Sequence, residues 1–397
     1  MKKIFISTIL SFLFISCSVG QDSAEFWKNK FDAALFSEYK DNKFSSREKY
    51  NKLSKSADQL HFMALSYGVN ALNTMYKATN DLKYLEINSE IIKNVIDKSV
   101  PLSTNNKRNS KTPYKGWVAK SRVKEYNIDK DIQLYDGYLF RYVAEYLYLI
   151  HTNELMNSSS ELKESYNIVL NYLENDVWKR WYEESIAEKG DLSLFFAIRT
   201  HMGSHWAAIA LYLNELSNEN EMRPIYEEVV NVYNSLLRNN FQVVDINGNK
   251  AYLWRSTYDN FSNSKVSKHK IRMSKEGLWQ DVSHGNQVID YIILSYEMKQ
   301  EWDEKDISFL VNTLRFLIWD EDKLIFNDYL ETDNKNNGLP GTGWKQSDGW
   351  LKLARFDKSL LKLFESLYEN NIQKIDKSSL ALQFYANMAY GYLSDSN

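Results

Sequence analysis

The sequence predicts an all-α protein, an (α/α) toroid or barrel of about six or seven helical hairpins with a small β-hairpin insertion. Apolar side chains recur at helical spacing along nearly the whole chain, which favours amphipathic helices. Proline and glycine are scarce, with 4 and 14 residues, and this disfavours an all-β fold with many turns. The helical segments follow one another with short polar connections, as the helices of αα-hairpins do.

Each expected helix rests on such a pattern. In the segment 303–318, one helix face carries the apolar residues Ile307, Leu310, Val311, Leu314, Leu317 and Ile318. The segment 131–152 is apolar almost all round, which is typical of a buried inner helix. Further helices are expected at about 26–40, 56–77, 82–97, 158–176, 193–217, 221–238, 280–299, 356–373 and 378–394.

Three longer irregular stretches interrupt the helices, at about 101–130, 240–279 and 322–350. In the second stretch, two β-rich runs flank Asn247-Gly248, a dipeptide that favours a hairpin turn. Insertions of this kind in a helical toroid normally lie over one rim, where functional residues tend to collect.

The N-terminus has the features of a lipoprotein signal. Two lysines precede an apolar run over 4–15, which is too short to span a bilayer but has the size of a signal-peptide core. The run ends in Phe14-Ile15-Ser16-Cys17, which resembles a lipobox with phenylalanine in place of the usual leucine. Acyl chains on Cys17 would hold the exported protein on a membrane. The alternative is a stray thiol in an ordinary cleaved signal.

We therefore expect residues 1–16 to be a lipoprotein signal peptide and 17–25 a lipidated tether. No linker divides 26–397, so this part is expected to be a single (α/α) toroid domain. The expected location is the cell envelope, with the outer membrane favoured and either its periplasmic or its surface face possible.

Composition excludes some classes of protein. Cys17 is the only cysteine, so a disulfide scaffold is excluded. The net charge of −3 gives no overall field that would recruit nucleic acid, and no nucleic-acid partner is expected. Aromatic residues reach 14%, and their rings can pack helices together or stack on the apolar faces of sugars.

Three of the six histidines lie in the most informative segments. His201 and His205 are four residues apart at a helix start and so lie on one face. His284 follows Asp281 by one turn, where another helix begins. A His pair at this spacing can bind a metal ion, but no cysteine or acidic cluster accompanies it, so we expect no metal and no cofactor. The histidines can be packing residues of the core, or they can exchange protons or contact substrate.

Another segment of interest follows the expected hairpin. It contains Arg255 and Tyr258 and precedes a basic run that starts at Lys265 and continues to Lys275. The run can be a solvated loop, or its cations can line a cleft for an acidic polymer.

Short motifs in this region resemble those of polysaccharide lyases. Ser204-His205-Trp206-Ala207-Ala208 resembles the Asn-Asn-His-Ser-Tyr-Trp-Ala-Ala motif of the helical-toroid alginate lyases of family 5. In those enzymes an arginine and a tyrosine follow downstream, as Arg255 and Tyr258 do here. The lipobox, the length and the layout are more similar to the family 38 polysaccharide lyases, which cleave uronic-acid polymers such as alginate and glucuronan.

The resemblance covers short motifs within about 195–290, and the sequence departs from it in one important way. Alignment on Trp-Ala-Ala places Gly203 where the family has its histidine, so that role must pass to His201 or His205. The asparagine pair before the motif is also absent, which leaves the group that neutralises the substrate carboxylate unassigned.

The resemblance implies β-elimination on a uronic-acid polymer. The carboxylate next to C5 must be neutralised so that the developing enolate charge is stabilised. A base then removes the C5 proton and an acid protonates the leaving O4. The preferred pair is His205 with Tyr258. His201 can take the place of His205, and His284 is a substrate contact or a replacement base. Arg255, Arg199 or Asn286 would neutralise the carboxylate.

Substrate-binding contacts are expected from Arg199, Asn286, Tyr135, Trp279, Trp344 and Lys265. The expected partners are therefore an acidic polysaccharide substrate and a membrane, the latter through Cys17.

Two alternatives remain at this point. A helical-toroid glycoside hydrolase needs two carboxylates that flank the scissile bond, and Asp136 and Asp281 are the candidates. A non-catalytic glycan-binding lipoprotein would need only the aromatic residues.

Overall fold

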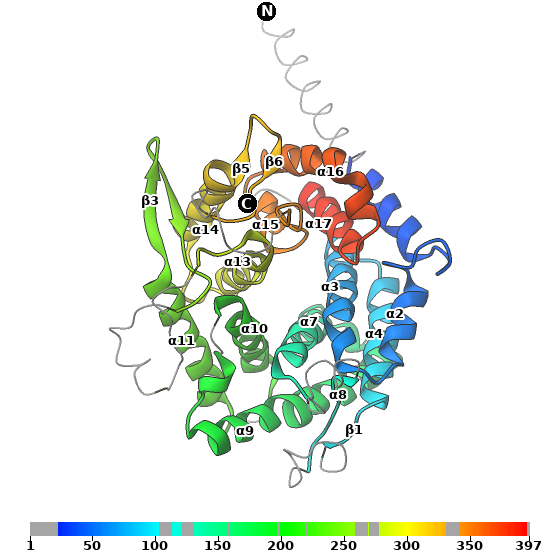
Figure 1. Cartoon of the computed structure of the whole chain (residues 1–397). Coiled ribbons are helices and arrows are strands. Elements are labelled where there is room, and N and C mark those ends of the chain that lie inside the picture. The colour runs from blue at the N-terminus through cyan, green and yellow to red at the C-terminus, as the bar shows by residue number, and fades with distance from the viewer. Residues whose placement is uncertain are drawn as a thin grey trace, which may run out of the picture.

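The structure is a computed structural model that describes residues 23–102, 113–120, 131–157, 159–196, 199–218, 221–258, 269, 278–330 and 341–394. Within these ranges the chain is mostly helical, with three small two-stranded sheets (Figure 1). The helices are one over 23–35, α2 (Arg47–Ser54), α3 (Phe62–Thr79), α4 (Lys83–Asp97), α7 (Gln133–Thr152), α8 (Ser160–Tyr172), α9 (Arg180–Lys189), α10 (Thr200–Leu216), α11 (Arg223–Asn240), α13 (Val282–Glu297), α14 (Glu304–Asn312), α15 (Gly349–Lys352), α16 (Leu360–Asp376) and α17 (Ala381–Leu393).

The three sheets are antiparallel and pair neighbours in sequence. They are β1 (Val100–Pro101) with β2 (Lys115–Gly116), β3 (Gln242–Ile246) with β4 (Asn249–Leu253), and β5 (Trp319–Asp320) with β6 (Ile325–Phe326). The expected hairpin in 240–279 is confirmed as β3–β4. Its turn residues Asn247 and Gly248 both have positive φ, 54° and 86°, as a type I′ turn requires.

Most expected helices are present with shifted ends. The helix expected from 56 starts at Phe62, because Asp58 caps a separate 3-10 turn over Gln59–His61. The helix expected from 193 starts at Thr200, and the 3-10 turn Ser193–Phe195 precedes it. Three helices were not expected, namely α2, α9 and the four-residue α15. In α2 only Tyr50 and Ser54 are buried, so it has no apolar stripe to predict it.

Six helices contact one another in a closed sequence. α3 packs on α7, α7 on α10, α10 on α13, α13 on α15, α15 on α17, and α17 on α3. His201 near the start of α10 stacks on His284 near the start of α13. Gly137 of α7 similarly faces His205 near the start of α10. Helices α7, α10 and α13 therefore run in the same direction.

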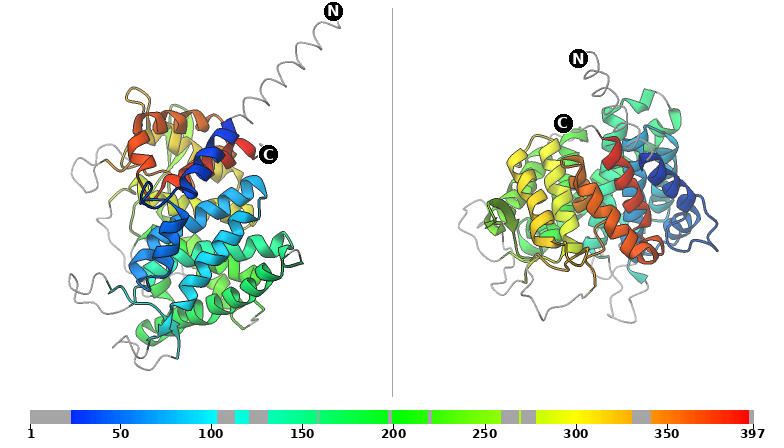
Figure 2. Two further views of the ribbon diagram at one scale, coloured as in Figure 1. Left: turned by 90° about the vertical axis from the view of Figure 1, so that its right-hand side faces the viewer. Right: turned by 90° about the horizontal axis from the view of Figure 1, so that it is seen from above.

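Other helices lie against these six. α4 packs on α3, α11 on α10, α14 on α13 and α16 on α17. The helix over 23–35 (dark blue) lies beside α16 and α17 (orange and red) in Figure 2, and Trp27 packs its ring against Tyr368 and Phe384. The two ends of the described chain are thus held together by aromatic packing.

Extended segments connect the starts of α10 and α13. The Ser256 carbonyl accepts a hydrogen bond from Thr200 N–H at 3.0 Å, and Ser256 N–H donates to the Leu278 carbonyl at 2.8 Å. Gln280 N–H donates in turn to the Trp254 carbonyl at 3.0 Å. The chain that follows β4 therefore lies across the starts of both helices.

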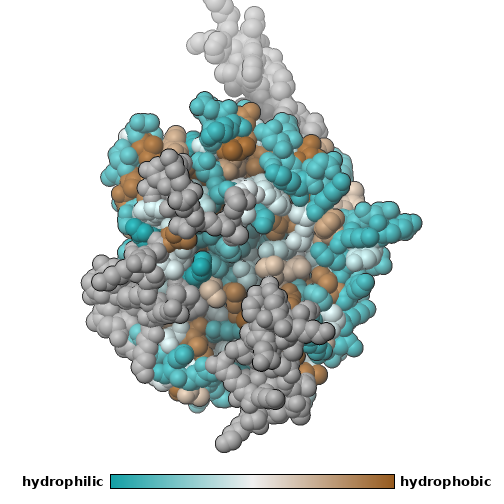
Figure 3. Space-filling model, viewed as in Figure 1, coloured by the Kyte–Doolittle hydropathy of each residue, from teal (hydrophilic) through white to brown (hydrophobic). Residues whose placement is uncertain are grey.

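Buried hydrophobic residues form one cluster that extends along the described chain from Trp27 to Ala389. The face seen in Figure 3 is mostly hydrophilic, with hydrophobic residues scattered over it. No helix in the described ranges has the length and apolar character needed to cross a bilayer. Cys17 and the expected signal peptide lie outside the described residues, and the single-domain organisation stays a prediction.

Candidate functional site

Three histidines gather where α10 and α13 begin. The rings of His201 and His284 are stacked, with centroids 4.3 Å apart and planes 27° from parallel. His205 lies one turn further along α10, and the charges of His201 and His284 contribute to lowering its pKa. The structure thus brings together the three histidines that the sequence singled out.

His284 is held by an ionised carboxylate. Asp281 is the N-cap of α13, and its Oδ1 accepts from the His284 backbone N–H at 3.0 Å and from the Ser283 hydroxyl at 2.7 Å. Burial raises the pKa of Asp281, but hydrogen bonds and charge from His284 outweigh burial and lower it to about 2. His284 Nδ1 lies 2.9 Å from both carboxylate oxygens. Its Nε2 is therefore left to exchange a proton, on a side chain that is 33% exposed.

His201 and His205 have a different environment. Both are buried, and burial lowers their pKa values well below the usual histidine value. Both rings are therefore neutral at neutral pH. His205 Nδ1 lies 3.3 Å from Nη1 of Arg141, and the ring packs against Tyr138 with centroids 4.4 Å apart.

Tyrosines from neighbouring helices border this cluster. Burial raises the pKa of Tyr138, and the charges of Tyr67, Tyr135 and Asp281 raise it further. Burial, with a contribution from Asp348, raises the pKa of Tyr67 to about 12. Tyr67 and Tyr138 therefore keep their protons at neutral pH, so in their resting state they can act as acids and not as phenolate bases. Tyr135 and Tyr67 are partly exposed.

Tyr258 lies on the other side of α10. A side-chain carbon added to Gly203 would meet the Tyr258 hydroxyl at 2.8 Å, and Gly203 is two residues from both His201 and His205. Residues two apart in a helix do not face the same way. The Tyr258 hydroxyl donates instead to the Phe196 carbonyl at 3.2 Å. The structure therefore does not bring His205 and Tyr258 together as expected, because helix α10 lies between the two side chains.

Cations and an indole lie at the same end of the molecule. The Arg255 guanidinium stacks 4.4 Å from the ring centre of Trp279, across a bridge between paired extended segments. Arg199 is exposed at the N-cap of α10, and its charge contributes to lowering the pKa of His201. Both arginines are thus placed near the starts of the helices that carry the histidines.

The other residues expected to contact substrate are Asn286, Trp344 and Lys265, and the structure does not place the first two among the histidines. Asn286 is buried, and its Nδ2 donates to the carbonyls of Ser283 at 3.0 Å and Lys345 at 2.7 Å. This amide therefore connects α13 to the segment before α15. Trp344 is half-buried beside Lys345. Lys265 lies outside the described residues.

Asp136, a candidate carboxylate for hydrolysis, is enclosed. It accepts hydrogen bonds from Gln59 Nε2 at 2.7 Å and Trp181 Nε1 at 2.8 Å, and it pairs with Arg180. Burial raises its pKa, against the opposing charge of Arg180. These partners occupy the oxygens of Asp136, so its carboxylate holds neighbouring segments of the fold together.

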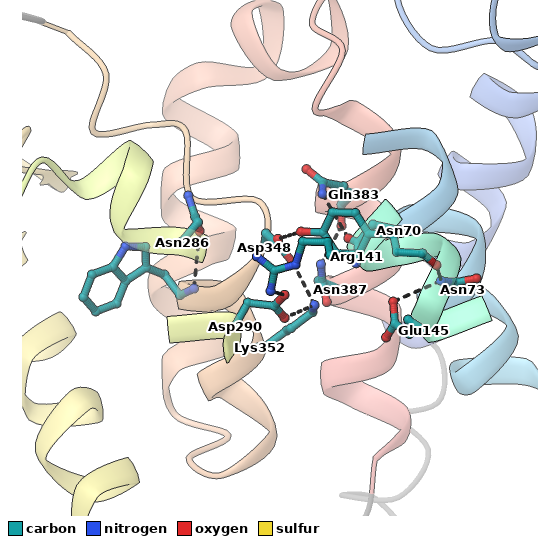
Figure 4. Close-up of polar contacts among 12 residues, drawn as sticks. Asn70, Asn73, Arg141, Glu145, Asn286, Asp290, Asp348, Lys352, Gln383 and Asn387 are labelled. Carbon is teal, nitrogen blue, oxygen red and sulfur yellow. Dashed lines mark hydrogen bonds and ion pairs between the residues drawn. The ribbon is translucent and has the colours of Figure 1, made fainter. Parts of the chain in front are cut away.

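A network of buried charges lies beside the histidine cluster, and Figure 4 shows its members. Arg141 pairs with Asp290, Asp290 pairs with Lys352, and Lys352 also lies 2.8 Å from Asp348. The Tyr142 hydroxyl donates to Asp348. Two cations and two carboxylates balance one another in this network, which offsets the cost of burying them.

The same network borders a small pocket. Its lining residues are Lys77, Arg141, Tyr142, Glu145, Tyr212, Asp290, Ile293, Leu294, Glu297, Lys352 and Arg355. The other charged residues of its lining are also paired: Lys77 lies 2.6 Å from Glu145, and Arg355 lies 2.5 Å from Glu297. The pocket therefore has no unpaired charge among these residues with which to bind a charged ligand.

Sequence reasoning missed Tyr67, Tyr138 and Arg141. The available signal was the pair of charged residues Arg141 and Glu145, which stand one turn apart inside the otherwise apolar segment 131–152. Buried charged residues need partners, so such a pair indicates a polar interior.

Among the described residues, no group of three or more histidine, cysteine, aspartate or glutamate side chains is placed to hold a metal ion. The sequence matches no protein-family model, no curated protein and no solved structure.

Proposed function

We propose that the protein is a polysaccharide lyase that cleaves a uronic-acid polymer, of the alginate or glucuronan type, by β-elimination. One observation carries the proposal. His284, oriented by ionised Asp281, lies beside neutral histidines, proton-bearing tyrosines and two arginines at one end of the molecule. A base, an acid and carboxylate-binding cations are the groups that β-elimination requires.

In this proposal His284 is the base. Its Nε2 takes the C5 proton, and the Asp281 carboxylate stabilises the imidazolium that forms. His201 keeps the ring in place by stacking, and its own neutral state avoids repulsion with protonated His284.

Tyr138 is the proposed acid. Tyr138 is buried, with 7% of its surface exposed, and it keeps its proton until the leaving O4 develops negative charge. Arg255 or Arg199 would hold the uronate carboxylate, and Trp279 would support a sugar ring.

The proposed architecture is an (α/α) toroid. The closed sequence of contacts from α3 through α17 supports it, as does the common direction of α7, α10 and α13. The proposal places the active site at the starts of these helices. It also keeps the export signal and the anchor at Cys17, which would hold the enzyme on the cell envelope beside polymeric substrate.

The test is direct. The protein is incubated with alginate, glucuronan, ulvan and hyaluronan, and with a neutral glucan as control, while the ultraviolet absorbance of the unsaturated product is followed. A lyase raises the absorbance with a uronic-acid polymer and not with the neutral glucan. New reducing ends without absorbance would indicate a hydrolase, and affinity without either product would indicate a glycan-binding protein. Either result would overturn the proposal.

A further inference from the structure

The Nε2 atom of His205 is a buried polar atom with no hydrogen-bond partner among the described residues. We infer that this nitrogen is a fixed hydrogen-bond donor for the carboxylate of the bound uronate, and that Arg141 is the positioning residue that sets its tautomer. The inference rests on the proposed lyase function. It adds a second group, beside Arg255 or Arg199, that neutralises the substrate carboxylate.

The contact with Arg141 determines the tautomer of His205. A guanidinium group has only N–H donors, so the Nη1 of Arg141 donates to His205 Nδ1 across their 3.3 Å separation. With Nδ1 as acceptor, the proton of the neutral ring lies on Nε2. His205 therefore presents an N–H group and no lone pair at the end of its ring.

Arg141 is itself fixed in place. Its Nη2 pairs with Asp290, and the other oxygen of that carboxylate pairs with Lys352. The Arg141 side chain is only 2% exposed, so solvent does not compete for its donors. The buried network thus gives a guanidinium that has one orientation and directs one N–H toward His205.

The His205 ring lies close to the proposed site, because the charges of His201 and His284 act on it. Side chains on a helix lean toward its N-terminus, and the N-terminal turn of α10 carries His201, which stacks on His284. Tyr138 covers the ring from α7. A buried N–H without an acceptor is costly, and a ligand oxygen at this position would remove that cost.

This donor suits the chemistry of the proposed reaction. As the C5 proton leaves, negative charge moves onto the carboxylate oxygens, and a preorganised N–H in a water-poor site stabilises that charge. A neutral sugar offers only hydroxyl and ring oxygens, which accept a weaker hydrogen bond than an ionised carboxylate does, so the donor favours a uronate. The proton on Nε2 stays there throughout, because His205 donates a hydrogen bond and transfers no proton.

The first test uses nuclear magnetic resonance of the full chain labelled with 15N-histidine. The expected spectrum has His205 with protonated Nε2 and unprotonated, hydrogen-bonded Nδ1. Addition of an oligouronate should shift the Nε2 resonance. A wild-type His205 that carries its proton on Nδ1, or an Nε2 resonance that saturating oligouronate leaves unmoved, would overturn the inference.

Arg141→Met tests the positioning role by the same spectrum, and His205 should then populate both tautomers. If this variant does not fold, Arg141→Met with Asp290→Asn keeps the charge balance of the network and serves in its place. A folded variant with an unchanged His205 tautomer would show that Arg141 does not set it.

The second test compares two replacements of His205. Glutamine places an amide N–H close to the position of Nε2, whereas leucine keeps the volume and removes the donor. We expect His205→Gln to stay within about tenfold of wild-type kcat/KM, and His205→Leu to lose roughly 10²- to 10³-fold. Equal and complete loss in both folded variants would assign His205 to proton transfer instead.

The two tests also separate this inference from the proposed function. If oligouronate shifts Nε2 but no polymer yields unsaturated product, the donor is supported as a uronate-binding group and the lyase reaction fails. If His205→Leu forms the unsaturated product with full activity, the lyase function stands and the donor role of His205 is wrong.

Discussion

The rings of His201 and His284 lie face to face with centroids 4.3 Å apart, although the two residues are 83 positions apart in the chain. Two imidazoles this close cannot both be charged without strong repulsion. His201 is buried and neutral, whereas His284 has Asp281 at its Nδ1. The stack thus places a neutral ring against the imidazole that Asp281 orients, and this arrangement supports the proposed role of His284 as the base.

The first prediction concerns the Asp281–His284 pair. Asp281→Asn keeps a good N-cap for α13 but removes the charge that stabilises protonated His284. We expect kcat to fall roughly 10²- to 10⁴-fold, and stability at neutral pH to fall as well, because the depressed pKa of Asp281 means that its charge stabilises the folded state. Steady-state kinetics and thermal unfolding measure the two effects. Ser283→Ala is the matched control, since it removes only a neutral donor to the same carboxylate. Full activity in Asp281→Asn would rule out the pair as base.

The second prediction distinguishes two tyrosines. Tyr138→Phe removes the proposed acid beside His205 and should lower kcat roughly 10²- to 10⁴-fold with little loss of substrate affinity. Tyr258→Phe removes the hydroxyl that donates to the Phe196 carbonyl, on the other side of α10 from the proposed site, so we expect near-normal kcat. Its stability should fall by about 1 kcal/mol. The reverse order of kcat values would return the acid role to Tyr258.

The third prediction concerns stability against pH. Burial lowers the pKa values of His201 and His205 below their value in the unfolded chain, 6.5. The unfolded chain therefore binds protons that the folded protein does not, and stability falls as pH drops below about 6.5. The slope should approach about 1.4 kcal/mol per pH unit for each histidine.

Asp281 causes a second loss of stability as pH falls from 3.8 to about 2, because its pKa in the folded protein is also below its value in the unfolded chain. Urea unfolding at a series of pH values measures both windows. His205→Gln should remove one histidine contribution to the upper window, and an unchanged slope in that variant would contradict the assignment.

The fourth prediction concerns the buried charge network. Lys352→Met leaves Asp290 and Asp348 without their shared cation in a buried site. Breaking such a pair typically costs about 3–5 kcal/mol, and we expect a loss of this size in denaturant unfolding. Lys40→Met, in an exposed pair with Glu38, is the control and should change stability little. Similar stabilities for the two variants would mean that the network does not support the fold.

The fifth prediction concerns the anchor. Cys17→Ser removes the proposed acylation site, so the variant should move from the membrane fraction to the soluble fraction of cells that express it. Fractionation followed by immunoblotting measures this. Equal membrane association of the variant and the wild type would remove the lipoprotein proposal.

Local features of the site could be predicted because they depend on short spacings. His201 and His205 share a helix face since they are four apart, and Asp281 caps the helix that carries His284 since it stands just before it. The sequence could not identify the acid in the same way. Tyr258 follows the histidine motif as the resemblance requires, yet it packs behind α10, and Tyr138 reaches His205 from α7.

The sequence by itself determined the helical class, the β3–β4 hairpin and the common face of His201 and His205, because these depend on periodicity and turn chemistry over a few residues. The tertiary structure alone decided which faces meet. It joins Arg141 to His205 across 64 positions and to Asp290 across 149. A helical period fixes which side chains share a face, but the helix that this face contacts is decided by how all the helices pack together around the buried core.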